Sequence, residues 1–395
     1  MNMPEIRFKD FKNEWKHFSF KEITYKAGIK NSENLSLESY SISNELGFIP
    51  QKEQFENGGT MSKADKRMYY IVSSNSFAYN PARINVGSLG YYQGIKDVIV
   101  SSLYEVFKTS DIVDDLFLLY WFKTNIFKRM IEQYQEGGVR LYFFFDKLQK
   151  CQIKIPSLQE QQKISSYFQK LDSLIQTTSK KLTSLKQIKA ASLQSMFPQE
   201  GETVPKVRFK GFEGEWEKEK LGKLFKERIE NNINGELLSV TINNGIIKAS
   251  ENGRFDNSNN DKSHYKVVKI GDIVYNTMRM WQGASGYSAY EGIVSPAYTV
   301  IIPQEQVFPL FFAYMFKTQS LINRFRIYSQ GLTTDTWNLK FTGFSGIEVC
   351  FPKSKLEQQK IASYFYNLDK QISLQAQRLE KLKQIKAACL DKMFV

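Results

Sequence analysis

The residue pattern that comes nearest to a catalytic motif is Asn80-Pro81-Ala82-Arg83. A DNA adenine methyltransferase flips its target base out of the helix and holds it in an Asn/Asp-Pro-Pro-aromatic loop, beside a glycine-rich turn that binds the methyl donor. The tetrapeptide lacks the second proline and the stacking aromatic residue, and the matching segment that begins at Asn276 has no proline at all. This pattern therefore does not predict a methyltransferase.

Other catalytic arrangements are also missing from the sequence. There is no GxxxxGK[ST] phosphate-binding loop, which argues against ATP hydrolysis. His17 and His264 are the only histidines, too few for a His-based metal cluster or catalytic triad. No convincing Pro-Asp…Glu-x-Lys nuclease arrangement occurs. We therefore expect a chain that is not an enzyme and that holds no cofactor or metal of its own.

The sequence does contain side chains suited to binding DNA. Tyr79, Asn80 and Arg83 recur with the same spacing as Tyr275, Asn276 and Arg279, each time between a predicted strand and a glycine-rich stretch. In the major groove Arg pairs with guanine and Asn with adenine, whereas Tyr and Ser commonly bind phosphates. Glycines let a backbone approach a ligand closely. A motif that is identical in both copies could equally stabilise a shared scaffold, with both arginines in internal hydrogen bonds.

Residues that specify different targets should differ between the two copies. Loops 51–66 and 251–262 differ in this way, as do 137–140 and 331–335. Together with the shared motif and its neighbours, they give the candidate DNA-binding residues Lys66, Tyr79, Asn80, Arg83, Tyr91, Arg140, Lys262, Tyr275, Asn276, Arg279, Tyr287, Thr333 and Thr334.

An internal repeat organises the whole chain. Segment 4–15 returns as 205–216, 160–168 returns as 357–365, and the hexapeptide Lys-Gln-Ile-Lys-Ala-Ala of 186–191 returns unchanged as 383–388. Between these matched segments the copies diverge but keep scattered residues in common. This is the pattern expected of two modules that share one scaffold and do the same job on different targets.

Two long helices are predicted, after Pro156 and after Pro352, each of about 40 residues. Their apolar positions follow a narrow heptad, which runs Ile164, Phe168, Leu171, Ile175, Thr178, Leu182 and Leu185 in the first copy and Ile361, Phe365, Leu368, Ile372, Gln375, Leu379 and Leu382 in the second. We expect the helices to pack on each other as an antiparallel coiled coil, with the polar position midway setting the register. The alternative is that each helix lies on the core of its own domain.

The parts between the matched segments predict mixed secondary structure. Runs at 69–72, 273–275 and 297–302 predict short strands, and segments 114–128 and 308–326 predict helices with a broad apolar face. The expected fold class is α+β, with two similar mixed domains, two antiparallel spacer helices and a pseudo-two-fold repeat. The expected boundaries are 1–155 and 198–351 for the domains, and 156–197 and 352–395 for the helices.

The net charge of +13 favours a polyanionic partner. The excess is concentrated in the predicted helices, since residues 151–200 carry seven Lys and Arg against three Asp and Glu. Solvated, lysine-rich helices would give the same excess. No apolar run approaches the roughly 20 residues of a membrane-spanning helix. Three widely spaced cysteines form neither a disulfide framework nor a zinc site and indicate a reducing, cytoplasmic location.

The Glu-Gln-Gln-Lys-Ile helices, the Phe-x-x-Glu-Trp segments at 11–15 and 212–216 and the duplicated layout resemble the specificity subunit of type I restriction-modification enzymes. The resemblance covers essentially the whole chain. It implies two target-recognition domains, antiparallel spacer helices and a non-catalytic subunit that reads a bipartite site in double-stranded DNA. It also implies two methyltransferase subunits docked on this chain, with restriction subunits joining the full complex. S-adenosylmethionine and ATP would then belong to those partners.

Two other functions remain open at this point. A stand-alone DNA methyltransferase or nuclease fragment would need the donor-binding turn that the sequence lacks. An architectural coiled-coil protein would not explain why the globular parts diverge while the helices stay alike.

Overall fold

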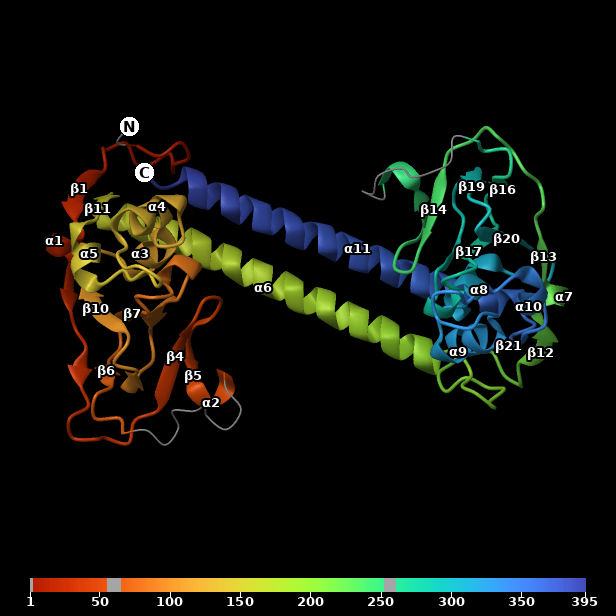
Figure 1. Ribbon diagram of the computed structural model, residues 1–395, viewed down its shortest axis with the longest axis horizontal. Coiled ribbons are helices and arrows are strands. Elements are labelled where there is room, and N and C mark those ends of the chain that lie inside the picture. Colours follow the sequence, from red (N-terminus) through yellow and green to blue (C-terminus); the bar gives the residue numbers. More distant parts are fainter. Residues whose placement is uncertain (1–2, 55–64, 252–260) are drawn as a thin grey trace. The chain divides into compact units, whose positions relative to one another are not determined.

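The computed structural model describes residues 3–54, 65–251 and 261–395 (Figure 1). By their contacts, residues 1–178 and 377–395 form one compact unit, and residues 179–376 form a second. Each unit therefore combines the globular part of one copy with the first half of its own long helix and the second half of the other copy's helix. The two units are described separately below.

The first unit contains three sheets. The two-stranded sheet pairs β1 (Lys16–Ser19) with β11 (Gln152–Ile155). The four-stranded sheet has the order β2-β10-β7-β8, with bounds Thr24–Lys26, Glu105–Thr109, Ser76–Tyr79 and Leu89–Tyr92. The five-stranded sheet has the order β3-β6-β9-β4-β5, with bounds Ile29–Lys30, Tyr70–Val72, Val98–Val100, Ser39–Ser43 and Gly47–Pro50. Strands β4 and β9 are parallel, and all other pairs are antiparallel.

Short helices complete the first unit. They are α1 (Phe20–Ile23), α2 (Gln51–Gln54), α3 (Asp115–Trp121), α4 (Asn125–Tyr134) and α5 (Phe145–Lys150), with a 3-10 turn at Ile84–Val86. Helices α3, α4 and α5 bury aromatic side chains, among them Phe117, Trp121 and Phe127, in the same core as Phe77 and Phe107 of the four-stranded sheet.

The second unit repeats the sheet order of the first. Its four-stranded sheet is β13-β20-β17-β18, with bounds Phe225–Glu227, Tyr298–Pro303, Ile273–Asn276 and Ser285–Tyr287. Three pairs accompany it: β12 (Glu217–Lys220) with β21 (Glu348–Phe351), β14 (Leu238–Thr241) with β15 (Gly245–Lys248), and β16 (Lys266–Val268) with β19 (Gly292–Val294). Its shorter helices are α7 (Leu221–Leu224), α8 (Pro309–Met315), α9 (Gln319–Tyr328) and α10 (Phe341–Ser345), with 3-10 turns at Ala249–Glu251 and Met280–Gln282.

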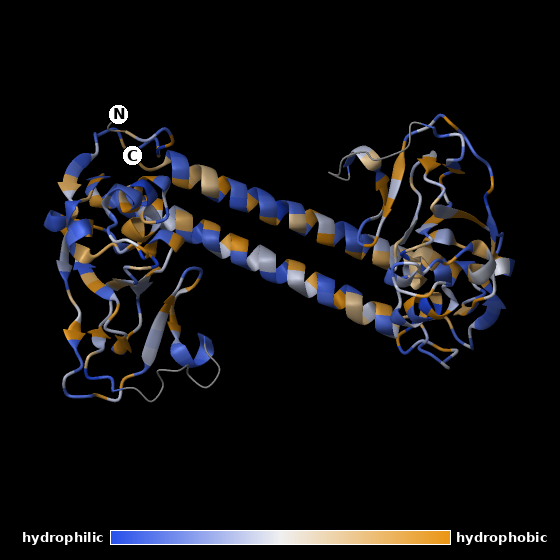
Figure 2. Cartoon of the chain, viewed as in Figure 1, coloured by the Kyte–Doolittle hydropathy of each residue, from blue (hydrophilic) through white to orange (hydrophobic). Residues whose placement is uncertain are grey.

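The two predicted long helices are present as α6 (Leu158–Ser195) and α11 (Lys355–Lys392). In the first unit they run antiparallel, because the Phe168 ring stacks on Phe394 and the Tyr167 hydroxyl lies 3.4 Å from the Cys389 sulfur. In the second unit Phe197 stacks on Phe365 in the same manner. The helices are mainly hydrophilic, with separated hydrophobic residues (Figure 2). This composition fits a narrow seam. The mixture of helices and sheets in each unit, together with the paired long helices, confirms the predicted α+β class.

The heptad positions are the buried side of these helices. Ile164, Phe168, Leu171 and the polar Thr178 are almost completely buried. Neighbours outside the heptad, such as Leu174, are exposed. The seam therefore follows the predicted register.

The prediction of one continuous helix at 114–128, and of another at 308–326, is wrong. Each breaks into two helices at a matched tripeptide, Phe122-Lys123-Thr124 in the first copy and Phe316-Lys317-Thr318 in the second. The Thr124 hydroxyl donates to the carbonyl of Trp121 at 2.7 Å and also accepts from the Phe127 amide. Such local side-chain bonds compete with the helical pattern, so threonine ends one helix and caps the next.

Each core is completed by the far end of the other copy's helix. In the first unit the Phe394 ring lies 5.3 Å from Phe117, and Met393 is buried beside it. In the second unit the Phe197 ring lies 5.4 Å from Phe311. The repeated Met-Phe pair therefore belongs to the hydrophobic cores.

Candidate nucleic-acid interface

The most strongly repeated residues anchor each long helix to its domain. Arg7 makes a two-point ion pair with Glu160, at 2.7 Å for both contacts, and the Glu160 side chain is 1% exposed. Arg208 and Glu357 form the matching pair at 2.7 and 2.9 Å. The ion pairs raise the pKa of both arginines. The positive charges of Arg7 and Arg208 are therefore neutralised by ion pairs inside the protein and are not available to DNA.

The glutamine that follows each of these glutamates fastens the same junction. Gln161 is completely buried, accepts from the amide of Asp114 at 2.8 Å and donates to the carbonyls of Ile112 and Pro156 at 3.0 Å. Gln358 makes the same three kinds of contact. The Glu-Gln pair of each repeated motif is thus a joint between helix and domain.

Tyr79 and Tyr275 are removed from the candidate interface by the structure. Both side chains are 0% exposed. Tyr79 packs against Phe107 and Phe143, and Tyr275 stacks on Phe344. Burial raises the pKa of both hydroxyl groups well above the usual value. The prediction that they bind DNA is wrong, because both side chains fill the aromatic cores of their domains.

Asn80 and Asn276 shape a turn. The Asn80 side-chain oxygen accepts from the Ala82 amide at 3.0 Å, and Asn276 accepts from the Met278 amide at the same distance. Asn side chains commonly close such turns. For these two residues the scaffold interpretation of the sequence is therefore supported, although both remain partly exposed.

Arg83 and Arg279 differ from the rest of the shared motif. Both side chains are exposed, and within the described parts of the chain neither makes a side-chain hydrogen bond or ion pair. Their backbones are fixed, since the Arg83 carbonyl accepts from Val86 and Ser88 and the Arg279 carbonyl accepts from Gln282 and Ala284. Each turn therefore presents a free guanidinium group on a rigid backbone.

The structure brings a second candidate loop beside each of these arginine turns. The Phe143 amide donates to the Pro81 carbonyl at 3.0 Å, which joins the Arg140 loop to the Arg83 turn. The Leu339 amide donates to the Thr277 carbonyl at 2.8 Å. That bond places the loop of Thr333 and Thr334 beside the turn of Arg279. Arg140, Thr333 and Thr334 are all exposed.

In the second unit, aromatic side chains that the sequence reasoning missed join these two loops. Trp281 and Trp337 lie edge to face with ring centres 5.2 Å apart, and the Arg326 guanidinium lies 5.8 Å from the Trp337 ring centre. Both tryptophans are partly exposed. The first copy has Asn85 and Leu141 at the corresponding places. The two domains therefore have matching backbone contacts between these loops but different side chains on them.

Tyr91 and Tyr287 lie half-buried on β8 and β18. The Tyr91 hydroxyl lies 2.9 Å from Asn75 and 2.8 Å from Asp115, and burial together with the Asp115 carboxylate raises its pKa. Its hydrogen-bonding capacity is thus used internally. Lys66 and Lys262 lie before β6 and β16, where their carbonyls accept from the amides of Tyr69 and Tyr265. These backbone bonds do not connect them to the arginine turns. The rest of the predicted loops 51–66 and 251–262 falls largely outside the described residues.

The β4–β5 and β14–β15 turns, which the sequence did not single out, also lie beside the candidate interface. A Cβ atom added to Gly90 would lie 3.2 Å from the Gly47 Cα, and one added to Gly286 would lie 2.8 Å from the Gly245 Cα. The sequence predicted that Gly90 and Gly286 let the backbone approach a ligand. In the structure they instead let a hairpin pack closely against the neighbouring strand. That contact sets each hairpin turn next to an arginine turn.

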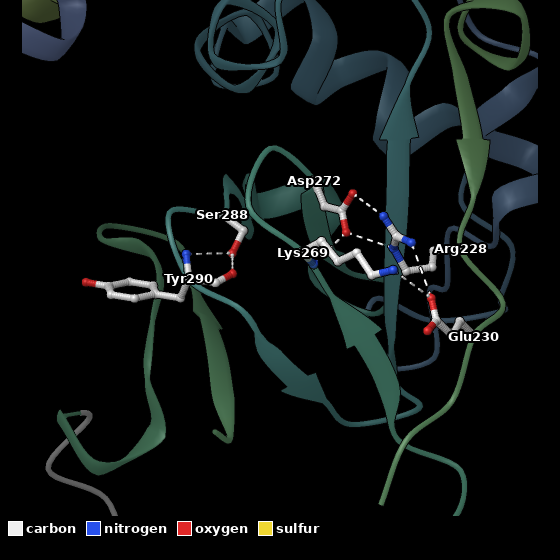
Figure 3. A network of polar contacts seen from close by, with 6 residues as sticks. All are labelled: Arg228, Glu230, Lys269, Asp272, Ser288 and Tyr290. Atoms are coloured by element: carbon white, nitrogen blue, oxygen red, sulfur yellow. Dashed lines mark hydrogen bonds and ion pairs between the residues drawn. The ribbon is translucent and has the colours of Figure 1, made fainter. Parts of the chain in front are cut away.

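The second domain also has an ionic network, built around the buried pair Arg228 and Asp272, that has no counterpart at the matching positions of the first (Figure 3). Arg228 makes two 2.8 Å bonds to Asp272, whose side chain is 3% exposed, and Glu230 links Arg228 to Lys269. The ion pair with Asp272 raises the pKa of Arg228. Ala27 and Ser76 occupy the corresponding positions in the first copy, so this network fixes the strands of one domain only.

Groups able to hold a metal ion, with three or more His, Cys, Asp or Glu, do not occur among residues 3–54, 65–251 and 261–395. A search of the same residues finds no helix long and apolar enough to cross a membrane. Cys151 and Cys389 are buried free thiols, and Cys350 is a partly exposed one.

Two domains of one fold, each presenting different exposed side chains around an arginine turn with the same backbone hydrogen bonds, are typical of a duplicated recognition protein. The family model for the type I restriction modification DNA specificity domain matches residues 13–187 and again residues 213–384. The chain therefore belongs to the family of type I restriction-modification DNA specificity proteins, which makes it a recognition protein and not an enzyme.

Solved structures resemble this chain, and one of them shares its fold. The S subunit of a type I restriction-modification system from M. genitalium is 13% identical, with a TM-score of 0.57, and the match covers 100% of this chain and 99% of that one. The HsdS subunit from Thermoanaerobacter tengcongensis is 14% identical, with a TM-score of 0.49 and 96% of each chain covered. At these identities the likeness concerns the fold alone. A comparison with curated protein sequences finds no match.

Proposed function

We propose that this chain reads a bipartite DNA target, with each domain recognising one half-site through its arginine turn and the loops around it. The observation that carries this proposal is the pair Arg83 and Arg279. Both are exposed and rigidly mounted, and both sit beside loops that differ between the copies. An arginine that is the same in both copies and sits on a fixed turn suits a phosphate or guanine contact, and neighbours that differ between the copies suit different bases.

Charge supports DNA as the ligand. The chain carries 54 Lys and Arg against 41 Asp and Glu. The arginines of the helix anchors are neutralised by buried carboxylates, so the positive charge offered to a partner comes from other residues. We expect binding to weaken steeply with salt, because neutralised phosphates release counterions.

The long helices and their joints suit a second role as a docking platform. We infer that two methyltransferase subunits bind this chain and that restriction subunits complete the complex. S-adenosylmethionine and ATP are then bound by those partners, and this chain holds no cofactor. Free cysteines fit assembly in the cytoplasm.

Methylation mapping in cells with and without this chain tests the proposal. We expect a bipartite adenine motif that disappears when the chain is removed, and an unchanged methylation pattern would contradict the proposal. A gel shift of the purified chain at low and high salt separates it from an architectural coiled-coil protein, which would show no preference for the mapped site.

Incubating the purified chain with labelled methyl donor and the mapped duplex tests the stand-alone enzyme. We expect no transfer and no cleavage until the partner subunits are added. Stoichiometric methylation by the chain alone would show that catalytic residues were overlooked.

A further inference from the structure

Lys317 occupies an unusual position in the second domain. It lies in the break between α8 and α9, and its ammonium group donates to three backbone carbonyls, those of Gly283 at 2.5 Å, Ser285 at 2.8 Å and Ile242 at 3.2 Å. An ammonium group has three N–H donors. Within the described residues, all three are therefore directed at main chain, and none is left for a ligand.

The three carbonyls belong to two different recognition elements. Gly283 ends the 3-10 turn that carries Arg279, and Ser285 begins β18. Ile242 lies in the β14–β15 turn, whose next two residues, Asn243 and Asn244, are exposed. One side chain thus ties the hairpin turn to the arginine turn.

The first domain has the same lysine without the same contacts. Lys123 corresponds to Lys317, but its ammonium group lies over the ring of Tyr120, 5.3 Å from the ring centre. The space next to it is a cavity of about 450 Å³. Its lining includes Asn44, Gly87 and Leu89, the counterparts of the residues whose carbonyls receive Lys317. There the Ser88 hydroxyl, donating to the Ile42 carbonyl at 3.1 Å, links the hairpin to the turn instead.

We propose that Lys317 is a positioning residue for DNA recognition, and that it holds the β14–β15 turn so that Asn243 and Asn244 read bases of the second domain's half-site. Exposed asparagine amides can pair with the N6 and N7 atoms of adenine in the major groove. Such pairing needs a fixed backbone, because an amide on a mobile turn loses entropy on binding. The proposal deepens the proposed function and rests on it.

Burial gives this tie a pH dependence. It lowers the pKa of Lys317 to about 8, an effect that nearby Lys189 strengthens and Asp369 opposes. Above pH 8 the group loses its charge and one donor, so the tie weakens. In the unfolded chain the pKa of this lysine has its higher, ordinary value. Between the folded and the unfolded pKa, the unfolded chain therefore binds more protons than the folded chain. The contribution of Lys317 to the free energy of unfolding thus rises with pH in this range. Recognition by the second domain should therefore weaken as the pH rises through 8.

The test measures discrimination with the full chain. Anisotropy of a labelled duplex that carries the mapped target is compared with that of duplexes in which one half-site or the other is scrambled. This gives one affinity ratio for each half-site. We expect Lys317→Met to lower one ratio at least about tenfold, the usual scale for losing a charged hydrogen bond, and to leave the other ratio unchanged. The matched control Lys123→Met should leave both ratios within about twofold.

A second variant distinguishes a loss of DNA recognition from a loss of folding. Replacing Asn243 and Asn244 together by Ala alters only exposed side chains and should lower the same ratio as Lys317→Met. In the wild-type chain that ratio should fall between pH 7 and pH 9.

The possible results separate the two proposals. A wild-type chain that discriminates neither half-site would overturn the proposed function itself. If the wild-type chain discriminates both half-sites, and Lys317→Met or the asparagine variant retains both ratios, the positioning role is refuted.

Discussion

The ammonium group of Lys386, near the end of α11, lies 2.5 Å from the carboxylate of Asp172 in the first half of α6. The other carboxylate oxygen of Asp172 accepts from the Tyr120 hydroxyl at 2.9 Å. In the second unit Lys189, Asp369 and Tyr314 repeat this arrangement, with the ion pair again at 2.5 Å and the tyrosine at 3.0 Å. Each lysine comes from the repeated Lys-Gln-Ile-Lys-Ala-Ala hexapeptide, so that motif joins one copy's helix to the other copy's domain.

This relationship predicts measurable coupling between Asp172 and Lys386. In a double-mutant cycle of Asp172→Asn and Lys386→Met, urea unfolding should give an interaction energy of about 1 kcal/mol, modest because both groups are partly exposed. The Lys163–Asp10 pair, at 3.3 Å and with side chains 50% and 74% exposed, provides the control and should give almost none. Equal interaction energies in the two pairs would mean that the Asp172–Lys386 pair stabilises the chain no more than an exposed ion pair does.

The helix anchor predicts a larger effect. Arg7→Met leaves the Glu160 carboxylate buried without its partner, which should destabilise the first unit by about 3 kcal/mol in denaturant unfolding. Arg7→Met combined with Glu160→Met removes the unpaired charge and should be less destabilised than the single variant. A double variant as unstable as Arg7→Met would show that the cost arises from lost packing instead.

Arg83→Ala and Arg279→Ala should each weaken DNA binding without changing the unfolding temperature, because neither side chain makes a hydrogen bond or ion pair with the residues that the structure describes. A base contact predicts a loss of about 1–3 kcal/mol that is confined to one half-site. A phosphate contact predicts a loss that is independent of sequence and a shallower salt dependence. Unfolding without any binding defect would favour a purely structural role for the turn.

The seam predicts that Leu171→Lys together with Leu182→Lys disrupts the docking platform. Each change loses roughly 1.5–3 kcal/mol of burial and introduces a charge. Pull-down of the methyltransferase subunit should fall, while near-UV circular dichroism shows that the domains remain folded. Gln176→Lys changes an exposed position of the same helix and serves as the control. Unchanged pull-down by the leucine variant would mean that the partner binds elsewhere.

The reciprocal helix links predict the behaviour of fragment 1–197. It retains Tyr120, Asp172 and Lys189, so two copies can form both links with each other as an isologous dimer. Two identical domains related by a two-fold axis must read a palindrome. With its methyltransferase partner, the fragment should methylate a symmetric motif that contains one half of the parental site. Methylation of the asymmetric parental site would overturn the assignment of one half-site to each domain.

The repeat and the heptad made the architecture predictable from the sequence, because identical segments and a seven-residue period are properties of the chain itself. The interface was only partly predictable. Identity between the copies did not distinguish Tyr79, which fills the core, from Arg83, which is exposed four residues later. Nor did it identify the β14–β15 turn, whose place beside Arg279 depends on a contact between Gly245 and Gly286, 41 residues apart. Such long-range contacts leave little local signal in a single sequence.

The sharing of helix ends between copies also has a consequence for synthesis. Phe168 and Phe117 need Phe394 to complete their packing, yet Phe394 is made more than 220 residues after Phe168. At typical elongation rates of about 5–20 residues per second, the first domain spends roughly 10 to 45 seconds with this aromatic patch uncovered. The second domain already has its Phe197 when its own first strand is translated. The domain that is synthesised first is thus the last to complete its hydrophobic core. Until Phe394 is made, the exposed aromatic side chains around Phe117 and Phe168 are a site where a chaperone would bind the nascent chain.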